Sequence, residues 1–373
     1  MVCATSLAAL MLVGAGPPTP EPFSDLVPNN FCVSRDGKRL AMDGWQIWDI
    51  PSRKKILEGK SLGFTGMDFS PDGRFFACGG NYAYLHVFDA RTGKLHWDLT
   101  LKHGDTVLTH IEFTPDGRHL VSAATNGTIR VWDVRGKKAV ALFCFPSAAW
   151  YNQESQDDYL AAWRALVGKD RNPDDVKTFV KFKQPIKHLR QFSISPDGKT
   201  VAVYTDASEV LILELATGKI LKTLDTKVGS AYSLRFSPDG RTLAVGGGGG
   251  SGKDKLEANL DLWDVASGKR LWRRGADSDT VLWLAFSPDG KILASGGHYD
   301  GARVWEAATG KLMYQLHERK KDDWKKHEYS HVIGVAFLPD GKALLTLPAT
   351  RWKGAVHFWE PTTGKRIPQP LGE

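Results

Sequence analysis

The sequence predicts an all-β fold: a seven-bladed β-propeller of four-stranded antiparallel blades, with a short α-helical hairpin insertion. Three sequence markers predict it, and they recur in the same order seven times along the 373 residues. The markers are a Pro-Asp-Gly turn, a strand ending in an aromatic residue and an acid, and a Thr-Gly-Lys turn. One such sheet cannot bury both of its apolar faces, whereas seven sheets packed radially in a ring can.

The first marker is a tight turn between two apolar strands. Proline presets the backbone φ of the turn, aspartate accepts hydrogen bonds from the backbone ahead of it, and glycine adopts a positive φ. The seven turns read SRDG at 34, SPDG at 70, TPDG at 114, SPDG at 195, 237 and 287, and LPDG at 338.

The second and third markers define the rest of each unit. The strand ends read IWD at 47, VFD at 87, VWD at 131, ILE at 212, LWD at 262, VWE at 304 and FWE at 358. The turns that follow read SRK at 52, TGK at 92, RGK at 135, TGK at 217, SGK at 267, and TGK at 309 and 363. With the apolar stretches between them, these markers give four antiparallel strands per unit.

These markers, at a spacing of about 40 to 45 residues, resemble the WD-repeat (WD40) β-propeller family. The resemblance covers 24–144 as blades 1–3 and 186–373 as blades 4–7. In the family a His, a Ser or Thr, an Asp and a Trp form a structural hydrogen-bond set. The resemblance places this set in the third unit at His103, Ser122, Asn126 and Trp132, with Asn in place of Asp. Because Leu213 replaces the aromatic residue of the fourth unit, we expect the set to be incomplete in most blades.

Residues 1–23 form a separate N-terminal segment. An uncharged apolar run from Leu7 to Val13, a V-x-A sequence ending at Ala15 and a Pro-rich stretch predict a signal peptide and linker. We therefore expect export to the periplasm or the extracellular space, with no stable membrane span, because the run is too short to cross a bilayer. No Lys or Arg precedes Arg35, so a cytoplasmic location is the alternative.

Residues 145–185 interrupt the repeats and carry neither turn marker. Ser155 with Asp158 resembles a helix N-cap, and the following stretch YLAAWRALV has an apolar face. A second helix is expected to begin at Asn172 and Pro173 and to run through Phe179 and Val180. The segment is therefore predicted to form a helical hairpin insertion.

Two short motifs suggest enzymes and fail on context. HEYSH at 327–331 fits the zinc motif H-E-x-x-H, but in an extended chain its two histidines lie about 13 Å apart. A helix there would bring them together, yet no third ligand follows. GGGGSGKD at 247–254 has Asp254 where a phosphate-binding loop needs Ser or Thr. We expect no catalytic residues, no metal site and no cofactor.

The long insertions all fall at one end of the predicted ring, opposite the short turns. They are 145–185, 246–258, 317–331 and the seventh-blade loop LPATRWKG. Variable loops on a rigid scaffold usually carry binding sites, although surface drift is the alternative. Trp and Arg are common at binding hot spots. The candidate partner-binding residues are Trp324, Lys325, Lys326, Arg351, Trp352, Arg273 and Arg274.

The net charge of +7 comes from 49 basic and 42 acidic residues spread along the chain. Such a distribution predicts solubility rather than a nucleic-acid surface. The first functional hypothesis is a monomeric, non-catalytic scaffold that binds a protein or peptide. The basic loops favour an acidic partner. The alternative is a propeller enzyme or ligand-binding protein with a site over the central channel.

Overall fold

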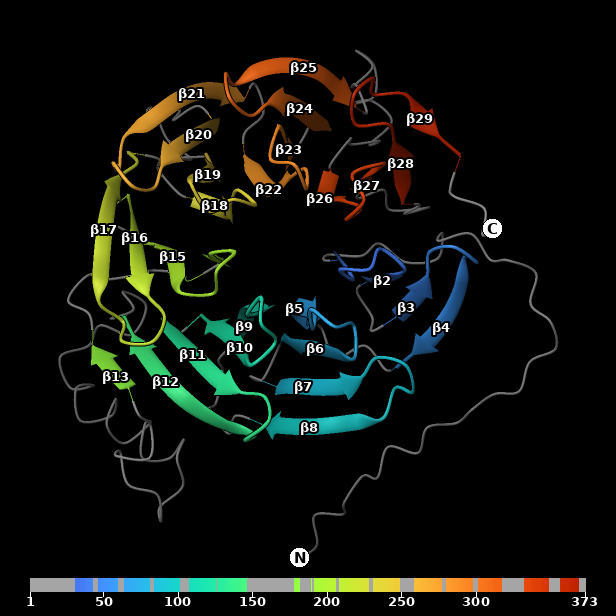
Figure 1. The fold of residues 1–373 in the computed structure, drawn as a ribbon, viewed down its shortest axis with the longest axis vertical. Helices are drawn as coiled ribbons and strands as arrows, with labels where there is room; N and C mark the ends of the chain where they lie inside the picture. The colour runs from blue at the N-terminus through green and yellow to red at the C-terminus, as the bar shows by residue number, and fades with distance from the viewer. Residues whose placement is uncertain are drawn as a thin grey trace, which may run out of the picture.

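The computed structural model describes residues 31–42, 46–59, 64–80, 84–100, 107–125, 127–145, 178–181, 189, 191–205, 208–227, 231–248, 258–276, 280–297, 301–316, 332–348 and 356–368. These residues form seven antiparallel sheets arranged as a ring (Figure 1). Each sheet is built from four strands that follow one another in the chain, and one sheet gains a fifth strand. The predicted seven-bladed β-propeller is confirmed.

The first three blades comprise β1 (Phe31–Val33), β2 (Arg39–Met42), β3 (Gln46–Asp49), β4 (Lys54–Glu58), β5 (Phe64–Phe69), β6 (Phe75–Gly80), β7 (Tyr84–Asp89), β8 (Leu95–Thr100), β9 (Leu108–Phe113), β10 (His119–Ala124), β11 (Thr128–Asp133) and β12 (Lys138–Cys144). In each blade the first strand lies nearest the centre of the ring and the fourth lies at its perimeter (Figure 1).

The remaining blades comprise β14 (Phe192–Ile194), β15 (Thr200–Tyr204), β16 (Glu209–Glu214), β17 (Ile220–Asp225), β18 (Ala231–Phe236), β19 (Thr242–Gly247), β20 (Ala258–Asp264), β21 (Arg270–Ala276), β22 (Val281–Phe286), β23 (Ile292–Gly297), β24 (Ala302–Glu306), β25 (Lys311–Leu316), β26 (Val332–Phe337), β27 (Leu344–Pro348), β28 (His357–Trp359) and β29 (Arg366–Ile367). Each Pro-Asp-Gly turn joins the first two strands of a blade, and each Thr-Gly-Lys turn joins the last two.

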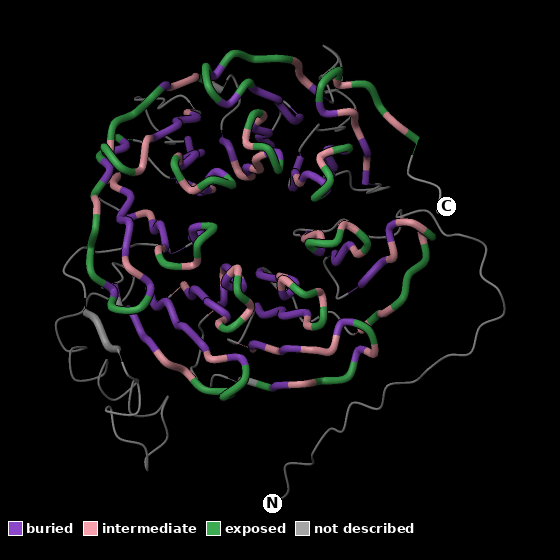
Figure 2. Tube along the Cα trace, viewed as in Figure 1, coloured by how far each residue is buried: buried purple, intermediate pink, exposed green. Residues whose placement is uncertain are grey.

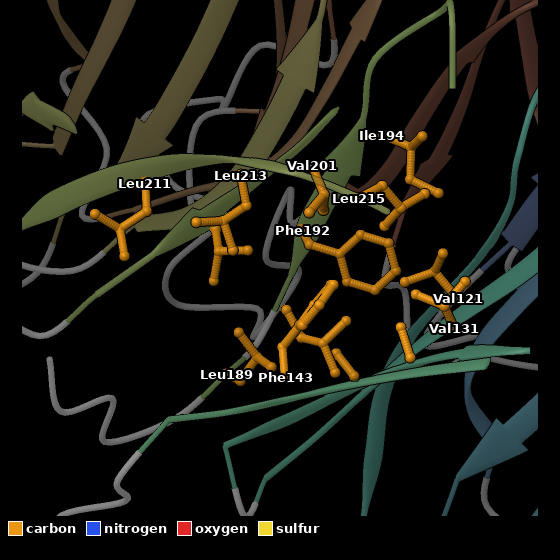
Figure 3. Close-up of a cluster of buried hydrophobic side chains, with 14 of the residues drawn as sticks. Val121, Val131, Phe143, Leu189, Phe192, Ile194, Val201, Leu211, Leu213 and Leu215 are labelled. Atoms are coloured by element: carbon orange, nitrogen blue, oxygen red, sulfur yellow. The ribbon is translucent and has the colours of Figure 1, made fainter. Parts of the chain in front are cut away.

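The apolar core is divided into seven clusters, one at each contact between neighbouring blades. Buried residues therefore lie along the middle of the blades, and the exposed positions lie in the turns and on the outer strands (Figure 2). Figure 3 shows the cluster between blades 3 and 4, where Phe143 faces Phe192 and Leu213. Leu213, which replaces the aromatic residue of the fourth unit, is fully buried there. Radial packing thus buries the faces that a single sheet would expose.

The ring closes by side-chain packing. All four strands of blade 1 come from the N-terminal side of the chain and all four of blade 7 from the C-terminal side, so the described residues contain no strand exchange. Phe31 and Leu338 belong to one buried cluster that joins the two blades. The ring of Phe31 lies so close to Gly334 that a Cβ at this glycine would overlap it. The first and last blades are therefore joined by an apolar contact.

The predicted second helix of the insertion is wrong over its last residues. Thr178–Lys181 forms strand β13, which pairs in parallel with β12, and Phe179 lies opposite Leu142. Thr, Phe and Val favour strands, and the outer edge of β12 offers backbone hydrogen-bonding groups that a helix would leave unused. Residues 146–177, with the predicted first helix, lie outside the described residues, as do residues 1–30. Within the described ranges no helix is long and apolar enough to cross a membrane.

Candidate functional site

The end of the ring that carries the short turns is tightly packed. A Cβ at Gly117 would lie 3.4 Å from Pro71 of the preceding blade, and one at Gly198 would lie 3.3 Å from Pro115. The same contact repeats for Gly37 with Pro339, Gly240 with Pro196, Gly290 with Pro238 and Gly341 with Pro288. In blade 1 Arg35 stands in place of the proline, and Gly73 of the next blade accordingly has open space around it. The seven turns therefore form a nearly continuous ring of contacts.

The opposite end of the ring receives the long connections. The strand ends that border 317–331, 249–257 and 349–355 all lie at this end, because each blade is an antiparallel meander. The HEYSH motif and most of the glycine-rich motif fall in these segments and lie outside the described residues. The same holds for five candidate binding residues, Trp324, Lys325, Lys326, Arg351 and Trp352.

Part of the predicted hydrogen-bond set is visible in blade 3. The indole N–H of Trp132 donates to the hydroxyl of Ser122 at 2.9 Å, inside the blade. His103 and Asn126 lie outside the described residues. The same contact joins Trp305 to Ser295 at 2.9 Å and Trp359 to Thr346 at 2.8 Å. Three blades thus use a hydroxyl on the second strand to satisfy an indole on the third.

The other blades depart from this pairing in ways that the sequence analysis missed. Where the aromatic is Phe88 or Leu213, the hydroxyl position holds Cys78 or Val203, so neither partner is polar. In blade 5, however, Trp263 is 5% exposed, and its Nε1 has no hydrogen-bond partner among the described residues. The corresponding position holds Val245, which the strand register sets opposite Asp261 just as Ser122 lies opposite Arg130. Aligning the second strands position by position would have revealed the mismatch.

Arg273 was expected in a binding loop, and this placement is wrong. The residue lies within strand β21 and faces β20, where Asp261 is fully buried. Its Nε and Nη2 donate to the two carboxylate oxygens of Asp261, each at 2.7 Å, and Nη2 also donates to the carbonyl of Thr226 at 2.5 Å. Hydrogen bonding to Asp261 raises the pKa of Arg273. The guanidinium neutralises a buried carboxylate and ties blade 5 to blade 4.

Arg274 also lies in β21 rather than in a loop, and it joins blade 5 to blade 6. Its Nε donates to the carbonyl of Gly310 at 2.8 Å and its Nη2 donates to that of Thr309 at 2.6 Å. The neighbouring Trp272 donates from Nε1 to the carbonyl of Ala307 at 2.9 Å. Both arginines are therefore engaged in contacts between blades.

A row of polar side chains links the innermost strands of blades 2 to 5. Asp68 Oδ2 accepts the backbone N–H of Phe113 at 2.7 Å, and Ser193 Oγ accepts that of Phe236 at 3.2 Å. Between them, Glu112 Oε2 accepts the N–H of Ile194 at 3.3 Å. Each acceptor stands two residues before the Ser or Thr of its turn. We call this row, Asp68, Glu112 and Ser193, the inner seam.

Charged groups gather around Glu112 in the inner seam. His110 Nε2 lies 3.7 Å from Glu112 Oε2, and Arg235 Nη1 lies 3.9 Å from Oε1. Burial, reinforced by the charge of Glu112, raises the pKa of Asp68 to about 7, although the N–H of Phe113 opposes the shift. Because these carboxylates accept backbone N–H groups of the next blade, their evident role is structural. Within the described residues no group of three or more His, Cys, Asp or Glu side chains is arranged to hold a metal ion.

A pocket of about 410 Å³ lies beside the outer edge of blade 7, between β28 and β29. Burial and the nearby positive charge of Arg366 lower the pKa of His357 to about 4, so this lining residue is neutral at physiological pH. Val356, Phe358, Ile367 and Pro368 supply apolar surface around it. The lining that the structure describes is thus mostly apolar, with the neutral imidazole of His357 and the guanidinium of Arg366 as its polar side chains.

Comparison with known proteins adds the family. The family model of the WD domain, G-beta repeat, matches residues 51–89, 98–133, 218–253 and 268–306. An uncharacterised WD repeat-containing protein of Synechocystis is 27% identical over 42% of this chain and 40% of its own length. The serine-threonine kinase receptor-associated protein of Gallus gallus is 22% identical over 61% of this chain and 63% of its own length. SEC12-like protein 2 of Arabidopsis thaliana is 28% identical over 52% of this chain and 51% of its own length.

The chain spans about half the length of these curated relatives. Its four matched repeats fall in blades 1 to 3 and 4 to 6, and each match begins at the outer strand of one blade and continues through the first two or three strands of the next. Both residues of the indole–hydroxyl pair lie within a matched repeat in blade 3 and in blade 6. The chain therefore contains WD40 repeats within a closed ring of seven blades.

Proposed function

We propose that the protein is a non-catalytic scaffold that binds a protein or peptide through the end of the ring that carries the long connections. The observation that supports this most is the asymmetry between the two ends. One end is packed turn against turn through Gly–Pro contacts, while 249–257, 317–331 and 349–355 all join strands at the other. A rigid ring with variable loops at one end is suited to recognition.

The chemistry of those loops favours an acidic partner. Trp324 with Lys325 and Lys326, and Arg351 with Trp352, combine aromatic surface with positive charge in two neighbouring connections. Aromatic residues and arginine dominate interface hot spots, and cations speed the encounter with an acidic surface. The name of the receptor-associated relative also describes a protein that associates with another. We propose a monomer that acts outside the cytoplasm and does not bind nucleic acid.

The test is affinity capture from the exported fraction of the native cell. The tagged full chain is compared with Trp324→Ala/Trp352→Ala and with Leu95→Ala, a control on the outer strand of blade 2. We expect specific partners with the wild type and the control, and their loss with the double variant. If the double variant retains all partners, the site assignment fails. If the wild type captures nothing specific from either the exported or the cytoplasmic fraction, the scaffold function fails.

A further inference from the structure

The perimeter of blades 4 to 6 is unusually apolar. Seven large hydrophobic side chains of the described residues are exposed, and five of them lie on three consecutive outer strands, β17, β21 and β25. These five are Ile220 at 37%, Leu221 at 47%, Leu271 at 51%, Leu312 at 43% and Met313 at 40% exposure. Single exposed hydrophobic residues are normal, but such a concentration marks an interaction surface.

The three strands form one continuous strip rather than three separate spots. Lys222 of β17 donates from Nζ to the carbonyl of Ala266 in the turn that precedes β21, at 2.9 Å. Arg274 of β21 donates to the carbonyls of Thr309 and Gly310 in the turn that precedes β25. Each outer strand therefore touches the turn that leads into the next, as the adjoining strands in Figure 1 indicate.

Positive charge accompanies the exposed aliphatic residues. The exposed cations at the start of the three strands are Lys219, Lys269, Arg270 and Lys311. The acids before them, Glu214, Asp264 and Glu306, accept hydrogen bonds from the hydroxyls of Thr217, Ser267 and Thr309 in their own turns. We call the five aliphatic residues and four cations the blade 4–6 strip. Its potential favours a partner with negative charge.

The backbone of these strands offers a further means of recognition. Among the described residues β17, β21 and β25 each end their sheet, whereas the outer strand of blade 3, β12, carries β13 alongside it. The parallel pairing runs from Ala141 opposite Thr178 to Cys144 opposite Lys181. An outer blade edge of this protein therefore already accepts an extended segment. Peptide addition to a sheet edge is a common mode of recognition.

We propose that the blade 4–6 strip binds an extended acidic segment of a partner protein, in which acidic and aliphatic residues alternate. Its acidic side chains would face Lys219, Lys269, Arg270 and Lys311, and its aliphatic side chains would cover Leu221, Leu271 and Leu312. This surface lies on the perimeter and goes beyond the proposed binding at the loop-bearing end.

The probe is a short fluorescein-labelled peptide of alternating Glu and Val, titrated with the purified full chain and followed by fluorescence anisotropy. The test variant is Leu271→Glu/Leu312→Glu. The matched control is Ile56→Glu/Leu95→Glu, which changes the two large exposed aliphatic residues that the described part of the chain has outside the strip. We expect the test variant to weaken binding about tenfold or more, because it loses two apolar contacts and gains repulsion. We expect the control to bind like the wild type.

Three results would overturn the proposal. The wild type could fail to bind the peptide, the two double variants could lose affinity equally, or a peptide of alternating Glu and Ser could bind as well as the Glu–Val peptide. Phosphatidylserine vesicles provide a separate comparison. If Leu271→Glu/Leu312→Glu weakens vesicle binding to the same extent, and if the peptide does not compete with the vesicles, the strip binds a lipid surface instead of a peptide. Trp324→Ala/Trp352→Ala should leave peptide binding unchanged, which separates this test from that of the proposed function.

Discussion

The buried indole of Trp263 predicts that Val245→Thr and Val203→Thr, the same change in blade 4, will differ in their effect on the free energy of unfolding. In the part of the chain that the structure describes, Trp263 Nε1 has no hydrogen-bond partner, while Trp132, Trp305 and Trp359 each donate to a hydroxyl at the position that Val245 occupies. Threonine has nearly the shape of valine, so the change adds an acceptor with little change in volume. The matched control is Val203→Thr, which places the hydroxyl in a blade where Leu213 replaces the indole.

The magnitude follows from the cost of leaving polar groups unpaired. A buried donor without a partner costs about 1–3 kcal/mol, and a buried hydroxyl without one costs about the same. In Val203→Thr no indole offsets that cost, because Leu213 stands where blade 5 has Trp263 and Val203 lies in the apolar cluster of blades 3 and 4. In Val245→Thr the new hydroxyl and the indole N–H satisfy each other. We therefore expect Val245→Thr to be the more stable variant by about 1–3 kcal/mol.

Urea unfolding of both variants under identical conditions, followed by circular dichroism, measures this difference. ¹⁵N NMR of the indole groups provides a second readout, because one buried indole N–H should shift downfield in Val245→Thr and exchange more slowly. Equal destabilisation by the two variants, with no change among the indole signals, would refute the reasoning.

Three further outcomes follow from individual contacts. Burial raises the pKa of Asp68 from 3.8 to about 7, so the folded chain holds a proton that the unfolded chain releases, and stability should fall as pH rises through this window. Asp68→Asn should remove that fall and raise the melting temperature more at pH 8 than at pH 5; an equal effect at both would contradict it. Arg273→Ala should cost about 3–5 kcal/mol in urea unfolding, because it removes both short hydrogen bonds to the buried Asp261 and leaves only the longer ion pair with Arg270 at 3.8 Å, and adding Asp261→Asn should recover part of the loss. Gly310→Ala should lower the melting temperature more than Gly73→Ala, because both glycines have positive φ but only at Gly310 would a Cβ lie 2.7 Å from Trp272.

The sequence predicts the blade count and strand order because their determinants are local. A turn such as Ser70–Gly73 folds through its own groups: the hydroxyl of Ser70 donates to Asp72 at 2.6 Å, and Asp72 accepts the N–H of Arg74 at 3.0 Å. The same local turn and strand pattern recurs in every unit, so its repetition predicts the ring of blades. The position of β13 is different in kind, because Thr178–Lys181 becomes a strand only where β12 offers its edge.

Arg273 illustrates why the candidate binding residues were harder to assign. Counting outward from the turn at Ser267 would place Trp272 opposite Asp261, but a one-residue shift in pairing between Leu262 and Trp263 brings Arg273 there. A bulge of this kind moves a side chain to the other face of a sheet. A sequence that combines arginine and tryptophan fits a binding hot spot and an inter-blade contact equally well. Only the strand register distinguishes the two.

The inner seam indicates how the repeats have become unequal around the ring. Asp68, Glu112 and Ser193 each accept a backbone N–H of the following blade. In blade 5 the same position holds Arg235, whose guanidinium cannot accept a hydrogen bond and instead lies 3.9 Å from Glu112. Blades 6 and 7 hold Ala285 and Ala336 at the same position. Outer-strand bonds accompany the inner seam between blades 2 and 3 and between blades 4 and 5, through Lys137 and Lys222. Between blades 5 and 6 the outer-strand bonds of Arg274 hold the contact near the perimeter, on blades that bear the blade 4–6 strip.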